Sequence, residues 1–319
     1  MIITQGLTRW YGDFLALDAL DLELSEGDLF GFIGPNGAGK TTTMKILATL
    51  LDPTEGRAFV GGVDVVKEPK KVRRLVGYMP DFFGVYREMR VAEYLAFFAA
   101  AYRVSRRDQR RVVGDLLELV DLAHKSEDTV GALSRGMQQR LGLARALVHD
   151  PKVLILDEPA SGLDPRARVE VREILLELSR MGKTILLSSH ILPELSSVCN
   201  RIGIIARGSL LALGSVDEVA ASVAAPTLHI RLGELPEDAD PQALLAAALG
   251  HEVSWNAEAR VWSVDVGGEM PLTPEDAARS IVGAQLPLRY LHPVQASLEE
   301  VFLRLTADMD LGSEGEDAA

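Results

Sequence analysis

The sequence predicts an α/β fold with a mostly parallel sheet. Continuous apolar runs occupy residues 29–33 and 153–156, which is typical of strands buried on both faces of a sheet. Segments with apolar residues at three- and four-residue spacing follow, so strands and helices alternate along the chain. A glycine-rich segment, residues 34–41, connects the first apolar run to a helical segment. The first domain is therefore predicted to be an α/β core in which a glycine-rich loop opens a helix.

The glycine-rich loop fits the phosphate-binding pattern of Gly, four residues, Gly, Lys and then Ser or Thr. Its glycines let backbone N–H groups point at phosphate oxygens, and the following helix adds a positive partial charge. We expect Lys40 to reach the β- and γ-phosphates and the Thr41 hydroxyl to bind Mg²⁺. The residues expected to contact the nucleotide here are Gly34, Pro35, Asn36, Gly37, Ala38, Gly39, Lys40, Thr41 and Thr42.

The rest of the first domain follows the same strand-and-helix logic. Residues 19–24 alternate between apolar and acidic side chains, which predicts a half-buried, antiparallel strand at the edge of the core. From residue 85 to 149 the spacing is helical, and this indicates a helical insertion. The other predicted helices and strands are helix 41–51, strand 75–79, helices 91–102, 107–120 and 135–149, helix 166–181, strand 184–187 and strand 201–206. We assign residues 1–220 to this nucleotide-binding domain.

A second, smaller domain is predicted over residues 226–307. Its expected elements follow the order β-α-β-β-α-β, which suggests a ferredoxin-like α/β module. They are strand 228–232, helix 241–249, strands 253–255 and 261–266, helix 274–284 and strand 288–291. Thr273 with Asp276, and Ser297 with Glu300, resemble capping boxes, the second of which opens a helix over 297–305. Residues 308–319 are acidic and are expected to be a disordered tail.

Composition narrows the classes of function. The 319-residue chain has a formal net charge of −13 at pH 7, which argues against nonspecific nucleic-acid binding as its main role. Cys199, the only cysteine, lies in an apolar stretch and is expected to be a buried thiol in a reducing cytosol. We see no signal peptide and no uncharged apolar window of about 18 residues, so we expect no membrane span.

Two carboxylates end the apolar strand 153–156. Asp157 is placed to hold Mg²⁺ beside the phosphate loop, directly or through water, and Glu158 to polarise the attacking water as general base. An acidic strand end that simply faces solvent is the alternative, and the phosphate loop upstream makes it the weaker one. The pair therefore predicts hydrolysis of a nucleoside triphosphate.

Several further motifs match a known family in order and spacing. With them, the chain resembles the ATP-binding subunit of ABC transporters over about residues 1–215. Tyr11 stands where that family stacks an aromatic ring on adenine. Residues 133–140 resemble the family's signature loop, and residues 159–164 the loop that follows the second carboxylate. His190 matches the switch histidine that contacts the γ-phosphate. The resemblance implies ATP and Mg²⁺ as ligands, with Glu158, His190 and Asp81 as the residues expected to serve catalysis.

The signature loop implies a dimer. Ser134 and Gly136 begin the helix 135–149, where backbone N–H groups and the serine hydroxyl form an anion site. In the family this site, with Asp164 nearby in the next loop, meets the γ-phosphate that the other subunit's phosphate loop holds. Because each chain has one phosphate loop and one signature loop, the simplest arrangement is a homodimer with two composite sites.

Three residues depart from the family pattern. Arg135 and Met137 replace a glycine and the glutamine of the signature, and we expect Arg135 to face solvent or a partner rather than phosphate. Asp81 stands where the family has a glutamine that reaches Mg²⁺ and relays to the membrane subunit. A carboxylate still binds Mg²⁺, so nucleotide binding is expected to survive, whereas the rate of hydrolysis and its coupling are in question.

The resemblance also implies partners. Phe82, Phe83, Val85 and Tyr86 form either an apolar groove for a separate integral membrane permease or the core of the helical insertion. An arginine cluster is interpreted as a solvated helix face, with anionic headgroups or the permease as the alternative partner; its members are Arg103, Arg106, Arg107, Arg110 and Arg111. Residues 296–306 resemble the end of ABC-2 type exporter ATPases, which include drug-resistance pumps. We expect a cytoplasmic ATPase, peripheral to the inner face of the cell membrane, that drives export; the alternative is a soluble or regulatory ATPase with slow hydrolysis.

Overall fold

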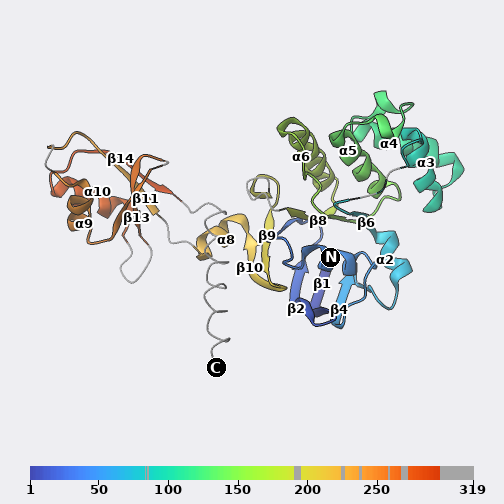
Figure 1. Cartoon of the computed structure of the whole chain (residues 1–319), viewed down its shortest axis with the longest axis horizontal. Coiled ribbons are helices and arrows are strands. Elements are labelled where there is room, and N and C mark those ends of the chain that lie inside the picture. The colour runs from blue at the N-terminus through green and yellow to red at the C-terminus, as the bar shows by residue number, and fades with distance from the viewer. Residues whose placement is uncertain are drawn as a thin grey trace. The chain divides into compact units, whose positions relative to one another are not determined.

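The computed structural model describes residues 1–82, 84, 86–189, 195–223, 227–236, 239–257, 259–266 and 272–294. The chain divides into two compact units, Met1–Ser215 and Val216–Ala319 (Figure 1). Among the described residues, no helix has the length and apolar character needed to cross a membrane.

A six-stranded sheet forms the centre of the first unit, in the order β10-β9-β3-β8-β7-β6. Every neighbouring pair is parallel except β10 with β9, so the expected mostly parallel sheet is confirmed. Strands β3, β7 and β8 are buried along their whole length, which explains their continuous apolar sequences. The strands are β3 (Leu29–Ile33), β6 (Val76–Met79), β7 (Val153–Leu156), β8 (Thr184–Ser189), β9 (Arg201–Ala206) and β10 (Ser209–Ser215).

A second, antiparallel sheet packs beside the first, in the order β2-β1-β4-β5. Strand β2 contains the predicted segment 19–24 and pairs antiparallel with β1, as expected. Side chains from both sheets and from α1 join one buried cluster, which includes Leu20, Phe32, Met44 and Ile155. The strands are β1 (Ile2–Tyr11), β2 (Phe14–Leu24), β4 (Glu55–Val60) and β5 (Val63–Asp64).

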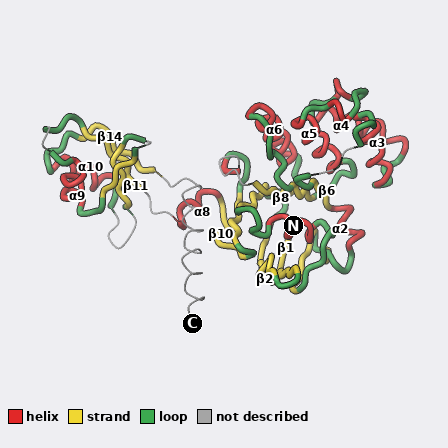
Figure 2. The backbone as a smooth tube through the Cα atoms, in the orientation of Figure 1, coloured by secondary structure: helices red, strands yellow, loops and turns green. Residues whose placement is uncertain are grey.

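Helices α3 to α6 lie together on one side of the six-stranded sheet, away from the antiparallel sheet (Figure 2). The first-unit helices are α1 (Lys40–Leu47), α2 (Pro69–Leu75), α3 (Val91–Ala101), α4 (Arg106–Leu119), α5 (Arg135–Leu147) and α6 (Pro165–Arg180), with 3-10 turns at Ala123–Lys125 and Val130–Ala132. Helix α1 was predicted to reach residue 51, and this was wrong. The chain leaves the helix at Thr49, whose φ of 62° is left-handed.

The second unit contains the predicted ferredoxin-like arrangement. Its four strands are antiparallel in the order β12-β13-β11-β14, with two helices inserted between them in the chain. Thr273 caps α10 by accepting a hydrogen bond from the Asp276 N–H, as its sequence indicated. The elements are α8 (Val216–Val223), β11 (Thr227–Leu232), α9 (Pro241–Leu249), β12 (Val253–Asn256), β13 (Val261–Asp265), α10 (Pro274–Gly283) and β14 (Leu288–Val294). The predicted helix 297–305, the box of Ser297 and Glu300, and the tail 308–319 lie outside the described residues.

Candidate functional site

A cavity of about 230 Å³ in the first unit gathers most of the residues that the sequence singled out. It lies where the phosphate loop, the end of β7 and the turn between β1 and β2 meet. Both polar and apolar side chains line the cavity, which suits a ligand that has a charged part and an aromatic part. The lining residues are Tyr11, Phe14, Ala16, Pro35, Asn36, Gly37, Ala38, Gly39, Lys40, Thr41, Thr42, Asp81, Asp157 and Glu158.

Two glycines of the loop are required by its close packing. A Cβ at Gly34 would lie 2.3 Å from the Ile205 carbonyl oxygen, so no side chain fits there. Gly39 has a φ of +108°, and a Cβ would lie 2.7 Å from the Ala16 carbonyl oxygen. The loop is thus held against β2 and β9 at both ends while its centre remains open to the cavity.

Lys40 occupies the inside of the loop. Its ammonium donates hydrogen bonds to the carbonyl oxygens of Gly34 at 2.6 Å and Pro35 at 3.1 Å. The side chain is buried, and this desolvation lowers the pKa of Lys40 from its ordinary value, although the negative charges of Glu158 and Asp157 oppose the shift. The loop therefore holds the positively charged Lys40 ammonium at the cavity.

Asp157 joins the phosphate loop to the end of β8. One carboxylate oxygen accepts a hydrogen bond of 2.8 Å from the Thr41 hydroxyl, and the other accepts one of 2.7 Å from the Ser188 hydroxyl. Ser188 in turn accepts a hydrogen bond of 2.9 Å from the Glu158 N–H. Because Asp157 is only 2 % exposed, this network fixes both the carboxylate and the backbone that carries Glu158.

Glu158 has a backbone conformation unusual for its type, with a φ of 52°. The Ser161 N–H donates to the Glu158 carbonyl oxygen at 3.1 Å, which closes a turn directly after this residue. Such conformations persist only where the surroundings enforce them, and here Ser188 and the turn do so. The sequence did not predict this role for Ser188, which lies one residue beyond the predicted strand 184–187.

The turn between β1 and β2 forms the rim of the cavity. Tyr11 and Phe14 face each other across this hairpin, and both rings are exposed. The guanidinium of Arg9 lies 4.8 Å from the centre of the Tyr11 ring. Phe14 was not predicted, although an exposed aromatic three residues after Tyr11 is a usable signal for a second ring at this rim.

Asp81 reaches the cavity from the end of β6. It is exposed at the rim, two residues beyond Met79, whose carbonyl oxygen accepts a hydrogen bond of 2.8 Å from the Asp157 N–H. Burial, with an added contribution from the Asp157 charge, raises the pKa of the neighbouring Tyr78 to about 12. The site therefore presents carboxylates from two adjacent strand ends.

The signature residues do not line this cavity. Ser134 caps α5 by accepting a hydrogen bond of 3.3 Å from the Met137 N–H, and Asp164 caps α6 by accepting one of 2.9 Å from the Ala167 N–H. Gly136 lies between these two helix starts, where a Cβ would be 3.0 Å from that of Ala167. His190 lies outside the described residues.

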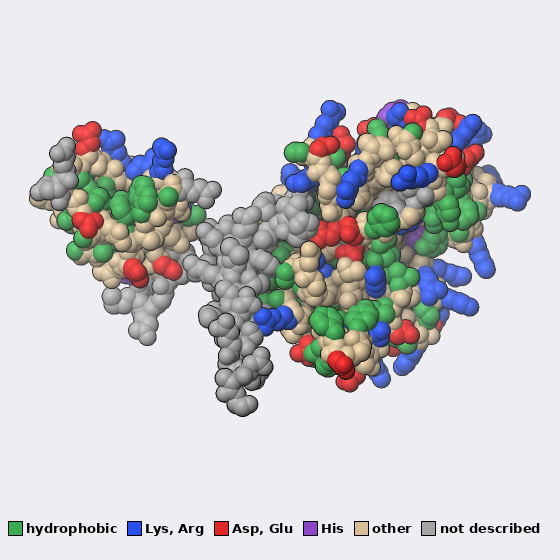
Figure 3. All heavy atoms as spheres, viewed as in Figure 1, with side chains coloured by type: hydrophobic (Ala, Val, Ile, Leu, Met, Phe, Trp, Pro, Cys, Tyr) green, Lys and Arg blue, Asp and Glu red, His purple; other side chains and the backbone are tan. Residues whose placement is uncertain are grey.

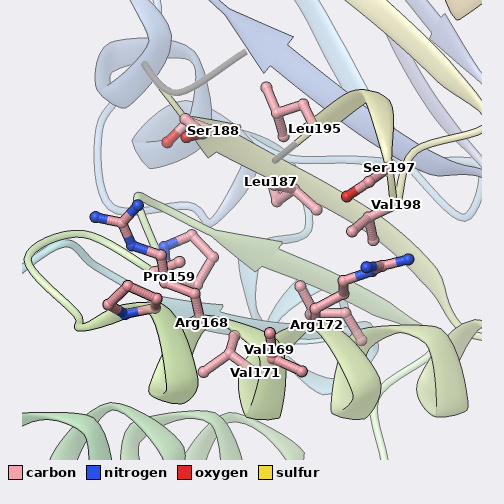
Figure 4. Close-up of a pocket in the computed structure, with 14 residues that line it drawn as sticks. Pro159, Arg168, Val169, Val171, Arg172, Leu187, Ser188, Leu195, Ser197 and Val198 are labelled. Atoms are coloured by element: carbon pink, nitrogen blue, oxygen red, sulfur yellow. The ribbon is translucent and has the colours of Figure 1, made fainter. Parts of the chain in front are cut away.

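A second cavity, of about 290 Å³, lies between α6 and β8 (Figure 4). Its walls are mainly apolar and include Val171, Leu187 and Leu195, with Arg168 and Arg172 also lining it. None of the predicted nucleotide-contacting residues belongs to its described lining.

Of the four apolar residues after Asp81, the structure describes two, because Phe83 and Val85 lie outside the described residues. Phe82 is 88 % exposed, so the alternative that it belongs to a core is wrong. Tyr86 is also exposed, and its ring packs edge-on against exposed Phe97 with centroids 5.8 Å apart. Basic side chains project from the edge of the same unit in Figure 3. Arg107 and Arg110 of the arginine cluster are exposed, as a solvated helix face requires.

Comparisons with known proteins show which family the chain is similar to. A family model described as ABC transporter matches residues 17–161. The daunorubicin resistance ATP-binding protein DrrA3 of Streptomyces coeruleorubidus is 36 % identical over 96 % of this chain and 96 % of its own. The Nod factor export ATP-binding protein I of Burkholderia orbicola is 38 % identical over 95 % of both chains. Solved structures that are similar include an ATP-binding subunit of an ABC transporter, 30 % identical with a TM-score of 0.64 over 70 % of this chain and 92 % of that one. A second is a dimeric, post-hydrolysis ATP-binding cassette bound to ADP and Pi, 25 % identical with a TM-score of 0.62 over 68 % of this chain and 99 % of that one.

Proposed function

The chain belongs to the family of ABC transporter ATP-binding proteins, and from that premise we propose that it binds and hydrolyses Mg²⁺-ATP to drive export through a separate membrane permease. The observation that carries the proposal is the cavity in which the phosphate loop faces Asp157 and Glu158. The near full-length relatives named for drug resistance and Nod factor export favour the export direction. The proposal has four parts: the metal, the attack, the dimer and the partner.

The residues at the loop fit Mg²⁺. The Thr41 hydroxyl and the Asp157 carboxylate are hard oxygen ligands already aligned with each other, and Asp81 offers a third from the rim. Mg²⁺ usually takes few protein ligands and binds substrate phosphates as well, so two or three such oxygens are enough. When bound, the ion would neutralise charge on the β- and γ-phosphates.

Hydrolysis requires a positive group at the phosphates and a base at the water. Lys40 already donates to oxygens inside the loop, so a phosphate can replace those carbonyl partners. Glu158, which also lines the cavity, accepts a proton from water as that water attacks the γ-phosphorus and the bond to the β-γ bridging oxygen breaks. The proposed product is ADP with inorganic phosphate.

We assign Ser134 and Gly136 to the second half of a composite site in a homodimer. They stand outside the cavity, at the start of a 13-residue helix whose N-terminal N–H groups suit an anion. The dimeric neighbour bound to ADP and Pi supports this assignment. ATP held by one subunit would then be completed by the signature loop of the other, so binding closes the dimer and hydrolysis releases it.

The exposed rings of Phe82, Tyr86 and Phe97 are the proposed contact for the permease. Large exposed aromatic side chains near one another commonly mark an interaction surface. Phe82 and Tyr86 follow Asp81 within a few residues, and Asp81 lines the cavity, so these two rings would connect the site to the partner. The protein would accordingly work at the inner face of the membrane without entering it.

The proposal is tested with purified wild type and Glu158→Gln. Wild type is expected to hydrolyse ATP only with Mg²⁺, whereas Glu158→Gln binds a fluorescent ATP analogue with similar affinity and loses nearly all turnover. Glu177→Gln, a change at an exposed α6 residue that pairs with Arg180, is the matched control and should keep wild-type turnover. Full activity of Glu158→Gln would remove Glu158 as the base.

Export is tested separately by capture of tagged Glu158→Gln, with ATP, from detergent-solubilised membranes. Recovery of a multi-span membrane protein supports the permease partner. Recovery of soluble proteins alone would favour the second candidate, a regulatory ATPase with slow hydrolysis. The observation that favours this second candidate is the carboxylate of Asp81 at the rim, because it adds negative charge where phosphate must bind.

A further inference from the structure

Arg135, the residue that departs from the family's signature, lies flat against Gly162. A Cβ built on Gly162 would be 2.5 Å from both Cζ and Nη2 of Arg135 and 2.8 Å from Nη1. Because these three distances are nearly equal, the guanidinium plane faces the α-carbon rather than pointing an edge at it. Gly162 has a φ of +67°, so its backbone conformation favours glycine, and a methyl group added there would have to displace the guanidinium.

This placement is unusual for a cation. Arg135 is the first residue of α5, where the positive end of the helix dipole disfavours a positive side chain. Among the residues that the structure describes, no carboxylate is ion-paired with it. A guanidinium is planar and weakly hydrated, so it can lie on a peptide surface without such a pair. The contact with Gly162 therefore accounts for the position of the side chain.

The loop that Arg135 touches is fixed at its far end and turns tightly at its near end. On the α6 side, the Leu163 carbonyl oxygen accepts a hydrogen bond of 3.0 Å from Arg168 Nε. On the other side, the Ser161 N–H donates to the Glu158 carbonyl oxygen. Gly162 lies between these anchors, so a group resting on it restrains the turn that starts at Glu158.

We propose that Arg135 is a positioning residue for hydrolysis, which holds the turn 158–161 through Gly162 and so keeps Glu158 in its strained conformation. The inference rests on the proposed ATPase function and deepens it. It makes the signature loop of a subunit a support for the general base of the same subunit. Arg135 itself touches neither nucleotide nor metal in this role.

The test compares steady-state ATP hydrolysis by the full chain and its variants. Arg135→Ala is expected to lower kcat about threefold to tenfold while KM for ATP stays unchanged, because the contact positions the base and does not bind substrate. Arg135→Lys should restore only a small part, since an ammonium cannot lie flat on Gly162. Arg106→Ala is the matched control: Arg106 is also the first residue of a helix capped by serine, and this change should leave kcat as in wild type.

A double-mutant cycle separates the contact from general damage. Gly162→Ala should lower kcat in the wild-type background, where the new methyl group displaces the guanidinium. In the Arg135→Ala background the same change should cost much less, because only the strain of the positive φ remains. Arg135→Met provides a second starting point if Arg135→Ala does not fold.

Four results would overturn the proposal. Three of them are wild-type kcat in Arg135→Ala, a raised KM with kcat intact, and effects of Arg135→Ala and Gly162→Ala that simply multiply. Full recovery by Arg135→Lys would also do so, since charge alone would then suffice. If wild type itself does not hydrolyse ATP, the proposed function fails, and the same cycle measured by Tm still decides whether Arg135 and Gly162 are coupled.

Discussion

Ser188 holds the two carboxylates of the site, and replacing it by alanine tests that directly. Its hydroxyl donates to Asp157 and accepts from the Glu158 N–H, and the side chain is fully buried. A hydrogen bond to a charged group contributes about 1.5–3 kcal/mol and a neutral one about 0.5–1.5 kcal/mol. Ser188→Ala should therefore lower the free energy of unfolding of the first unit by roughly 2–4 kcal/mol.

The same change should reduce turnover, because the backbone of Glu158 loses the partner that fixes its position. A small misplacement of a catalytic group costs about tenfold to a hundredfold in rate. Affinity for ATP should change little, because Lys40 and the loop N–H groups remain. Stability is measured by urea unfolding followed through Trp10 fluorescence, in a background with Trp255→Phe and Trp262→Phe, so that the signal reports the first unit alone.

Thr184→Val is the matched control on the same strand. Thr184 is also fully buried, and its hydroxyl accepts a hydrogen bond of 2.9 Å from the Gly27 N–H at the other end of β8. This variant should lose about 1–2 kcal/mol of stability and keep wild-type kcat. Equal kcat values for Ser188→Ala and Thr184→Val, or wild-type stability of Ser188→Ala, would refute the role given to Ser188.

Three further predictions concern other parts of the first unit. Lys40→Ala should abolish ATP binding by isothermal titration, and unchanged affinity would contradict the assignment of the loop. Asp81→Gln should raise kcat for ATP if the rim carboxylate slows hydrolysis, and a lower kcat would show that it serves catalysis. Burial lowers the pKa of His149 below its ordinary 6.5, so its neutral ring contributes stability that is present above that pH and lost as the pH falls. Urea midpoints at pH 7.5 and 5.5 should therefore differ more in wild type than in His149→Phe, which keeps a ring against Tyr102 and cannot titrate.

The sequence predicted the bounds of those strands and helices whose apolar pattern is strong and local. Strands β7 and β9 and helix α9 begin and end where the sequence placed them, because each is a strongly apolar segment flanked by polar residues or turn formers. The end of α1 was missed because apolar spacing continues to Leu51, whereas the chain reverses at Thr49. Strands β1 and β4 were not predicted at all; their pairing contains a register shift that no local pattern encodes.

Some residues of the site could also be predicted from local motifs, whereas Ser188 could not. The phosphate loop is one contiguous motif and the pair Asp157 and Glu158 is another, so each could be recognised from the sequence. The fold brings the two motifs together in one cavity. Ser188 depends instead on the register of β7 against β8, in which Leu156 stands opposite Leu187. That register brings the next residue of each strand, Asp157 and Ser188, within hydrogen-bond distance, and it is set by the whole sheet.

The register of the sheet also explains why the support of Glu158 comes from outside its own strand. Strand β7 ends at Leu156, so its pairing with β6 and β8 stops before Glu158, and the Glu158 backbone turns into the left-handed region. Two groups then replace the missing ladder: the Ser188 hydroxyl from β8 and the turn to Ser161, on which Arg135 rests through Gly162. If both are needed, Ser188→Ala and Arg135→Ala should each lower kcat, and the double variant should lower it by less than the product, because both act on the position of one residue. Effects that multiply would mean that the two groups support hydrolysis by separate routes.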